Sequence, residues 1–268
     1  MAVYIYPTHD DPAKVIDLKG IDQTYDNGKT FILKNLNFAI VADPGNGHIA
    51  GLLGASGSGK STILRYISGL QTPSAGTVLV NNKPPGSDNR VSMVFQEYSS
   101  MPWYTVLDNV SLALEYKGIP KKQRYEQAME MIKLVGLDGH QEKYAQYPAL
   151  SGGQLQRVAI ARSLLANSKI LLMDEPFGAL DIYTRLQMQD LLLSLQDKFK
   201  MYIIFVTHDV SEAVYLSDSI YMIKPNPAFI AEEIKIDLPT VRSRELKRNP
   251  HFIDLVHSVE DTMVRLSK

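Results

Sequence analysis

The fold is best indicated by one stretch of the chain, Ile49-Ala-Gly-Leu-Leu-Gly-Ala-Ser-Gly-Ser-Gly-Lys60-Ser-Thr-Ile-Leu64. An apolar run is followed by a glycine-rich loop and then by apolar residues at helical spacing. Glycines let successive backbone N–H groups turn toward a phosphate, and a helix that begins where the loop ends adds positive potential. The order of strand, glycine loop and helix therefore predicts a phosphate-binding loop.

This loop is expected to hold the phosphates of a nucleotide. Lys60 is expected to reach the β- and γ-phosphates, and Ser61 to bind Mg²⁺. A glycine-rich turn with a chance lysine is the alternative, and the flanking strand and helix argue against it. By itself the loop does not separate transporters from kinases or GTPases. The predicted contacts are Gly54, Ala55, Ser56, Gly57, Ser58, Gly59, Lys60, Ser61 and Thr62.

Short apolar runs alternate with helical patterns along the rest of the chain, which predicts an α/β fold with a mainly parallel sheet. Residues 14–25 and 31–41 precede the loop, are separated by a turn signal at 26–28, and predict an antiparallel hairpin. The expected buried strands are 91–95, 169–173, 202–206 and 219–223, and the expected helices include 154–166 and 183–198.

The pattern changes twice, and this suggests the domain organisation. Residues 97–165 lack a convincing buried strand and contain a charged helical stretch, so they are expected to form a helical subdomain inserted into an ATPase domain of residues 1–225. Residues 226–268 are polar and interrupted by proline. They are expected to form an extension that ends in a helix, because apolar residues recur there at helical spacing.

Two adjacent carboxylates follow the apolar run Ile170-Leu-Leu-Met. Because side chains alternate along a strand, neighbouring acids can perform different tasks. Asp174 is expected to hold Mg²⁺, and Glu175 to act as general base on the attacking water or to orient it. A strand that simply ends at solvent is the alternative, and the phosphate loop elsewhere in the chain favours the functional interpretation.

A second phosphate site is predicted at Leu150-Ser-Gly-Gly-Gln154. Ser151 is suited to the N-cap of a helix, and Gly152 and Gly153 let an anion approach the exposed amides. Gln154 completes the motif. A loop-to-helix junction without function could also carry Ser-Gly-Gly, but the full five residues followed by Gln156-Arg157 argue against this alternative.

With these motifs in this order, nearly the whole chain resembles the ABC ATPase family. The resemblance implies that two subunits enclose ATP, with the phosphate loop of one facing the signature motif, residues 150–154, of the other. It also implies roles for four further residues: Gln96 as the Q-loop glutamine that contacts Mg²⁺, Asp181 in the D-loop, His208 as the switch histidine at the γ-phosphate, and Tyr25 stacking on adenine. Taken alone, a glutamine after a strand or a lone histidine is more often structural or exposed. For Tyr25, packing at a strand edge is the alternative, and stacking is favoured.

The segment Met101-Pro-Trp-Tyr-Thr-Val106 and the tail from Asp237 to Leu255 resemble ATPases of nitrate, sulfonate, taurine and bicarbonate importers. This resemblance implies a second ATPase subunit, either identical or paralogous, transmembrane permease subunits and a periplasmic or lipid-anchored substrate-binding protein as partners. For Trp103, docking on the permease and plugging the helical subdomain remain alternatives. Residues 42–48 and Thr240-Val241 depart from the usual pattern, which weakens any assignment of the solute.

Composition limits the other classes of function. The 268 residues carry a formal charge of −1, and 28 basic residues balance 29 acidic ones, so no overall positive field favours nucleic acid. Cysteine is absent, which excludes thiolate chemistry. The longest apolar runs are far shorter than a bilayer span, and the N-terminus lacks the features of a secretory signal. The chain is expected at the cytoplasmic face of the membrane. Another class of transporter ATPase, or an ABC ATPase acting on nucleic acid, is the alternative.

Overall fold

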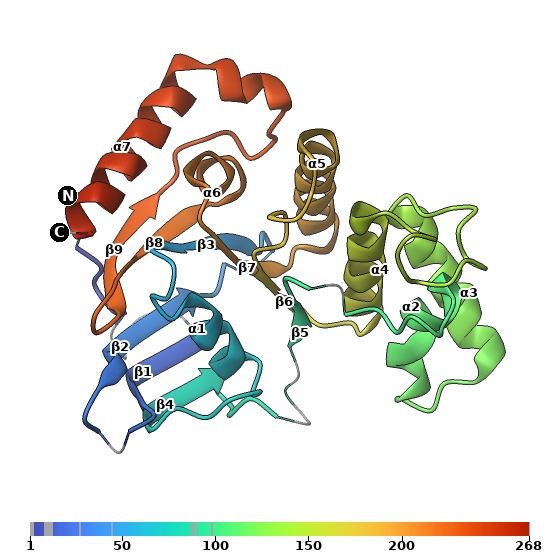
Figure 1. Ribbon diagram of the computed structural model, residues 1–268, viewed down its shortest axis with the longest axis horizontal. Coiled ribbons are helices and arrows are strands. Elements are labelled where there is room, and N and C mark those ends of the chain that lie inside the picture. The colour runs from blue at the N-terminus through green and yellow to red at the C-terminus, as the bar shows by residue number, and fades with distance from the viewer. Residues whose placement is uncertain are drawn as a thin grey trace.

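The computed structural model describes residues 3–7, 13–26, 28–43, 45–86, 89, 91–97 and 99–267. Two β-sheets lie on one side of the molecule and a lobe of helices lies on the other (Figure 1). The predicted turns at 26–28 and 42–47 each include one residue outside the described ranges, Asn27 and Pro44.

A six-stranded sheet forms the centre of the molecule, with the strand order β5-β6-β7-β3-β8-β9. Neighbouring strands are parallel except β8 and β9, which are antiparallel. The predicted mainly parallel α/β sheet is therefore confirmed. Its strands are β3 (His48–Gly54), β5 (Ser92–Val94), β6 (Ile170–Asp174), β7 (Tyr202–Thr207), β8 (Ser219–Lys224) and β9 (Phe229–Lys235).

A smaller antiparallel sheet has the order β2-β1-β4, with β1 at Lys14–Thr24, β2 at Phe31–Val41 and β4 at Ala75–Val80. The predicted hairpin of β1 and β2 is confirmed, whereas the sequence did not suggest β4, which is largely exposed. Helix α1 (Lys60–Ile67) packs its buried residues Ile63, Leu64, Tyr66 and Ile67 into the apolar core shared by the two sheets. This packing fixes the helix that follows the phosphate loop.

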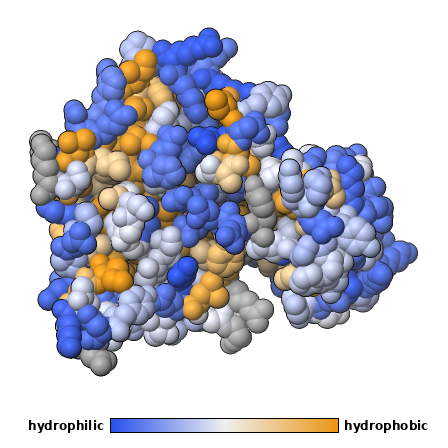
Figure 2. All heavy atoms as spheres, viewed as in Figure 1, coloured by the Kyte–Doolittle hydropathy of each residue, from blue (hydrophilic) through white to orange (hydrophobic). Residues whose placement is uncertain are grey.

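Helices α2 (Val106–Glu115), α3 (Lys121–Leu134) and α4 (Gly152–Leu165) form the lobe on the right of Figure 1. Thr105 caps α2 through a reciprocal pair of hydrogen bonds with Asp108, which fixes where this helix begins. The visible face of the lobe is mostly hydrophilic (Figure 2), and its apolar side chains, including Val110, Ile132 and Val158, are buried between the helices.

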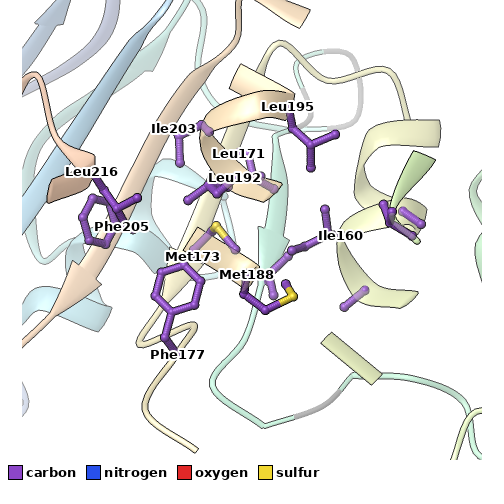
Figure 3. Close-up of a cluster of buried hydrophobic side chains, with 14 of the residues drawn as sticks. Ile160, Leu171, Met173, Phe177, Met188, Leu192, Leu195, Ile203, Phe205 and Leu216 are labelled. Carbon is purple, nitrogen blue, oxygen red and sulfur yellow. The ribbon is translucent and has the colours of Figure 1, made fainter. Parts of the chain in front are cut away.

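Helix α5 (Ile182–Phe199) covers the centre of the large sheet. Its residues Met188, Leu192 and Leu195 belong to the same buried cluster as Leu171 and Met173 of β6 (Figure 3). Phe177 lies in this cluster too and is only 1% exposed. The loop that follows Glu175 is thereby anchored to the core, which limits how far the end of β6 can move.

The chain after residue 225 differs from the prediction in one respect, because it begins with strand β9, which pairs with β8. A short 3-10 helix, Arg244–Arg248, and helix α7 (Pro250–Leu266) follow; α7 confirms the predicted terminal helix and packs near α6 (Val210–Leu216). Arg242 ties this segment to the sheet through a 3.0 Å ion pair with Asp218. Among the helices of the described residues, none is long and apolar enough to cross a bilayer.

Candidate ATP site

The parallel strands β3, β6 and β7 lie side by side and end at the same edge of the sheet. Their last residues are Gly54, Asp174 and Thr207. In open α/β sheets, ligands bind outside the carboxyl ends of the strands. The predicted phosphate loop, the acidic pair and His208 therefore follow neighbouring strand ends, as their roles require.

The phosphate loop has the backbone conformation that its glycines permit. Gly57 and Gly59 have φ values of 76° and 81°, a region that other residues rarely adopt. A Cβ atom at Gly59 would also lie 2.7 Å from Leu33 Cδ2. Lys60 Nζ donates to the carbonyl oxygens of Gly54 and Ala55 at 2.9 and 2.8 Å. The ammonium group is therefore held inside the loop.

Burial lowers the pKa of Lys60, while the charges of Glu175 and Asp174 oppose this effect. Ser58 in the same loop is buried, and its hydroxyl group has no hydrogen-bond partner among the described residues. The side chain of Ser58 thus contributes nothing polar to the loop, in agreement with a loop that acts through its backbone amides.

Ser61 Oγ donates a 2.9 Å hydrogen bond to Asp174 Oδ1, so two of the three residues predicted to bind Mg²⁺ are in contact. Burial raises the pKa of Asp174, and the hydrogen bond from Ser61 partly offsets this. A hydroxyl and a carboxylate oxygen are suitable ligands for Mg²⁺, which is typically bound by one or two protein oxygens together with phosphates and water. The described residues contain no cluster of three or more acidic, histidine or cysteine side chains that could hold a metal alone.

Glu175 lies beyond the end of β6 and has a left-handed φ of 43°. The two acids therefore diverge because the backbone turns between them, and not, as expected, through alternation along one strand. Such a conformation costs about 1–3 kcal/mol and is common at functional sites. The backbone N–H of Glu175 donates to the Val206 carbonyl at 3.0 Å, which holds the turn against β7.

Three predicted residues converge at the Glu175 carboxylate. Gln96 Nε2 donates to Glu175 Oε2 at 3.3 Å, and His208 Nδ1 lies 3.6 Å from the same oxygen. The structure thus brings together the predicted Q-loop glutamine, general base and switch histidine, although they are 33 or more residues apart in the chain.

A cavity of about 170 Å³ adjoins this group and includes residues that the sequence analysis missed. Among them is Glu212, which is 4% exposed and accepts a 2.6 Å hydrogen bond from Thr207 Oγ1. Arg185 lies 3.8 Å from Asp209 at the same cavity. One signal in the sequence could have indicated Glu212, because it lies four residues after His208 and one helical turn brings such residues close.

Ser151 caps helix α4 as predicted. Gln154 N donates to Ser151 Oγ at 3.3 Å, and Ser151 N donates to Gln154 Oε1 at 2.9 Å. Asp181 caps helix α5 by accepting from Thr184 N at 3.0 Å, and its hydrogen bonds with Thr184 lower its pKa. Among the described residues, no hydrogen bond or ion pair joins the signature motif to the phosphate loop of the same chain, and α4 and α1 lie in different parts of the molecule (Figure 1).

Two predicted aromatic contacts lie at the surface. Tyr25 is 69% exposed at the end of the small sheet, with its hydroxyl accepting from Gln71 at 2.9 Å. Trp103 is 66% exposed, next to Tyr104. This exposure excludes the interpretation of Trp103 as a core plug and leaves its ring available to a partner.

The fold and this site together define a nucleotide-binding ATPase of the phosphate-loop class. Residues 33–178 match the family described as ABC transporter, over more than half of the chain. The chain belongs to the ABC transporter family. It is an ATPase whose hydrolysis of ATP is coupled to transport.

Individual relatives agree with this assignment. The chain is 44% identical to the nitrate import ATP-binding protein NrtD of Synechocystis sp. over 234 residues, which cover 84% of this chain and 85% of that protein. It is 38% identical to the taurine import ATP-binding protein TauB of Pseudomonas putida over 248 residues, covering 90% and 92%. The dimeric ATP-binding cassette MJ0796, in a post-hydrolysis state with ADP and Pi, is 31% identical with a TM-score of 0.70, covering 84% and 100%.

Proposed function

We propose that the edge of the large sheet binds MgATP and hydrolyses it with the residues named above. Lys60 holds the β- and γ-phosphates, Ser61 and Asp174 hold Mg²⁺ together with Gln96, and Glu175 activates water. Mg²⁺ neutralises charge on the phosphates when bound. The observation that carries this proposal is the meeting of Gln96 and His208 at the Glu175 carboxylate, beside the contact of Ser61 with Asp174.

The ATP site is completed by a second copy or a paralogue. The capped N-terminus of α4, with Ser151, Gly152, Gly153 and Gln154, provides a phosphate-binding surface that its own phosphate loop does not use. The similar cassette MJ0796 is dimeric, which supports this arrangement. Asp181 lies at the start of α5, where the D-loop of such a dimer would be, and Tyr25 stacks on the adenine base.

The chain energises import of a small anionic solute at the cytoplasmic face of the membrane, together with permease subunits and a substrate-binding protein. The names of its relatives, nitrate import and taurine import ATP-binding proteins, support this class of solute. The exposed Trp103 supports a docking surface for the permease on the helical lobe. Residues 1–225 are the ATPase domain, with the helical subdomain at 97–165, and residues 226–268 are its extension.

A pull-down with the purified chain from detergent-solubilised membranes tests the assembly. The expected result is capture of a multi-spanning permease, with the ATPase activity of the captured complex above that of the chain alone. Capture of nucleic-acid enzymes with no permease would overturn the transport assignment. The solute is then identified by measuring which anions bind to the substrate-binding protein of the captured permease.

A further inference from the structure

A line of hydrogen bonds joins the segment after β9 to Thr207, the residue before His208. Lys247 Nζ donates to Gln189 Oε1 at 2.9 Å, and Gln189 Nε2 donates to Glu212 Oε1 at 3.0 Å. The other oxygen of Glu212 accepts from Thr207 Oγ1 at 2.6 Å. Thr207 directly precedes His208. The bonds thus pass from the 3-10 helix Arg244–Arg248, through α5 and α6, to the end of β7.

The side chains inside this line are almost fully buried. Gln189, Glu212 and Thr207 are 2%, 4% and 3% exposed, respectively. Leaving a buried amide or carboxylate without a partner is costly, so each bond constrains the next. The Gln189 amide is oriented at both ends, since its oxygen accepts from Lys247 and its nitrogen donates to Glu212.

Lys247 itself is held at this place by more than one contact. Its ammonium group lies 4.2 Å from the centre of the Tyr215 ring, and burial lowers its pKa against the opposing charges of Asp209, Glu212 and Asp190. The neighbouring Arg244 pairs with Asp190 at 2.6 Å, so adjacent residues of α5 bind the same 3-10 helix.

Thr207 also fixes the turn that carries the histidine. Its hydroxyl accepts from Asp209 N at 3.1 Å, while Asp209 Oδ1 accepts from Glu212 N at 2.9 Å. His208 is therefore flanked on both sides by residues bonded to Glu212.

We infer that Lys247, Gln189 and Glu212 are positioning residues for His208, through which the segment after β9 sets the rate of ATP hydrolysis. The inference rests on the proposed role of His208 at the γ-phosphate. Loss of the Lys247 ammonium frees the Gln189 amide to turn, which loosens Glu212 and Thr207 and misplaces the imidazole. Nucleotide binding at the phosphate loop is left intact, because none of the three residues contacts that loop in the described structure.

The test measures kcat and KM for ATP with the full chain at one high protein concentration in Mg²⁺. Lys247→Met is expected to lower kcat roughly tenfold with KM unchanged, because small misplacements of catalytic groups have effects of this order or larger. Lys247→Arg is expected to restore most of kcat, since it keeps a charged donor. Arg248→Met is the matched control, because Arg248 is the exposed next residue of the same 3-10 helix and its side chain forms no hydrogen bond or ion pair with any described residue.

The variants His208→Ala and His208→Ala with Lys247→Met complete the cycle. If Lys247 acts through His208, Lys247→Met has no further effect once the imidazole is absent. An equal loss of kcat with and without His208, or a Lys247→Met protein as active as Arg248→Met, overturns the inference. A His208→Ala protein with wild-type kcat would instead show that the proposed role of His208 is wrong, which is a separate outcome.

Discussion

The hydroxyl group of Ser61 donates a 2.9 Å hydrogen bond to Asp174 Oδ1, across 113 positions of sequence. This contact places a buried carboxylate beside the start of α1, and no cationic side chain in the described part of the chain is bonded to it. Asp174→Asn keeps the acceptor oxygen for Ser61 and removes the charge. Without Mg²⁺, we expect the variant to be more stable than the wild type, because it no longer buries a charge. The midpoint of thermal unfolding should rise by about 2–4 °C for each kcal/mol of desolvation cost that is removed.

The same substitution has a defined dependence on pH. The pKa of Asp174 is higher in the folded state than in the unfolded state. Its contribution to the free energy of unfolding is therefore fully present below the unfolded pKa, and it is lost as pH rises through the folded pKa. The stabilisation by Asp174→Asn is therefore expected to be larger near pH ~7 than near pH ~4. Thermal unfolding at both pH values checks this, and equal midpoint shifts would argue against a buried charge at Asp174.

Glu175→Gln keeps the shape of the side chain and removes the carboxylate that should activate water. Turnover is expected to fall by ~10²–10⁴-fold while ATP still binds, giving a stable dimer in ATP and Mg²⁺ that dissociates in ADP. Lys60→Ala, which loses the charge at the phosphates, is expected to form no such dimer. Hydrolysis rate and gel filtration are measured for both variants. Wild-type turnover in Glu175→Gln would remove it as the base.

Ser58→Ala removes a buried hydroxyl group that has no partner. The free energy of unfolding is expected to rise by about 1 kcal/mol, with the affinity for ATP unchanged because the loop binds through its amides. Ser56→Ala is the matched control, since Ser56 is exposed in the same loop. Denaturant unfolding and nucleotide titration of both variants give the comparison, and a destabilised Ser58→Ala protein would mean that the hydroxyl has a partner.

Trp103→Ala is expected to change the free energy of unfolding by less than about 0.5 kcal/mol, because the ring is 66% exposed. Stimulation of hydrolysis by the permease is expected to weaken while the basal rate stays the same. The two rates are measured with and without the reconstituted permease. A parallel fall in both rates would indicate that Trp103 supports the site and not the docking surface.

Local sequence predicted most of the large sheet, since β3, β6 and β7 are apolar runs followed by residues with distinctive chemistry. Strand β9 was missed because Glu232 and Glu233 make it polar, although Glu232 is buried and bonded to Arg265. Helix α6 was missed because it is one short segment, Val210–Leu216. Such elements are stabilised by their neighbours, which local patterns do not reveal.

Some residues of the candidate site could likewise be predicted from local sequence, whereas others depend on tertiary contacts. The phosphate loop and signature have fixed spacings, so residues such as Lys60 and Ser151 could be placed from sequence. Gln189 and Lys247 could not, because their importance arises from contacts across 23 and 58 positions of sequence, made by ordinary polar residues on helices. The left-handed backbone at Glu175 is also a property of tertiary packing, held by Phe177 and the bond to Val206.

The central claim is that one copy supplies the phosphate loop and another the signature motif. Mixing two inactive variants tests this directly. Lys60→Ala lacks a working phosphate loop, and Ser151→Arg, whose loss of the cap costs about 1 kcal/mol, blocks the signature. A mixed dimer contains one intact site, formed by Lys60 of one copy and Ser151 of the other. We expect that an equal mixture of the folded variants regains hydrolysis, up to about a quarter of the wild-type rate for random pairing. A mixture no more active than the sum of its parts, or a fully active Ser151→Arg protein, would contradict it.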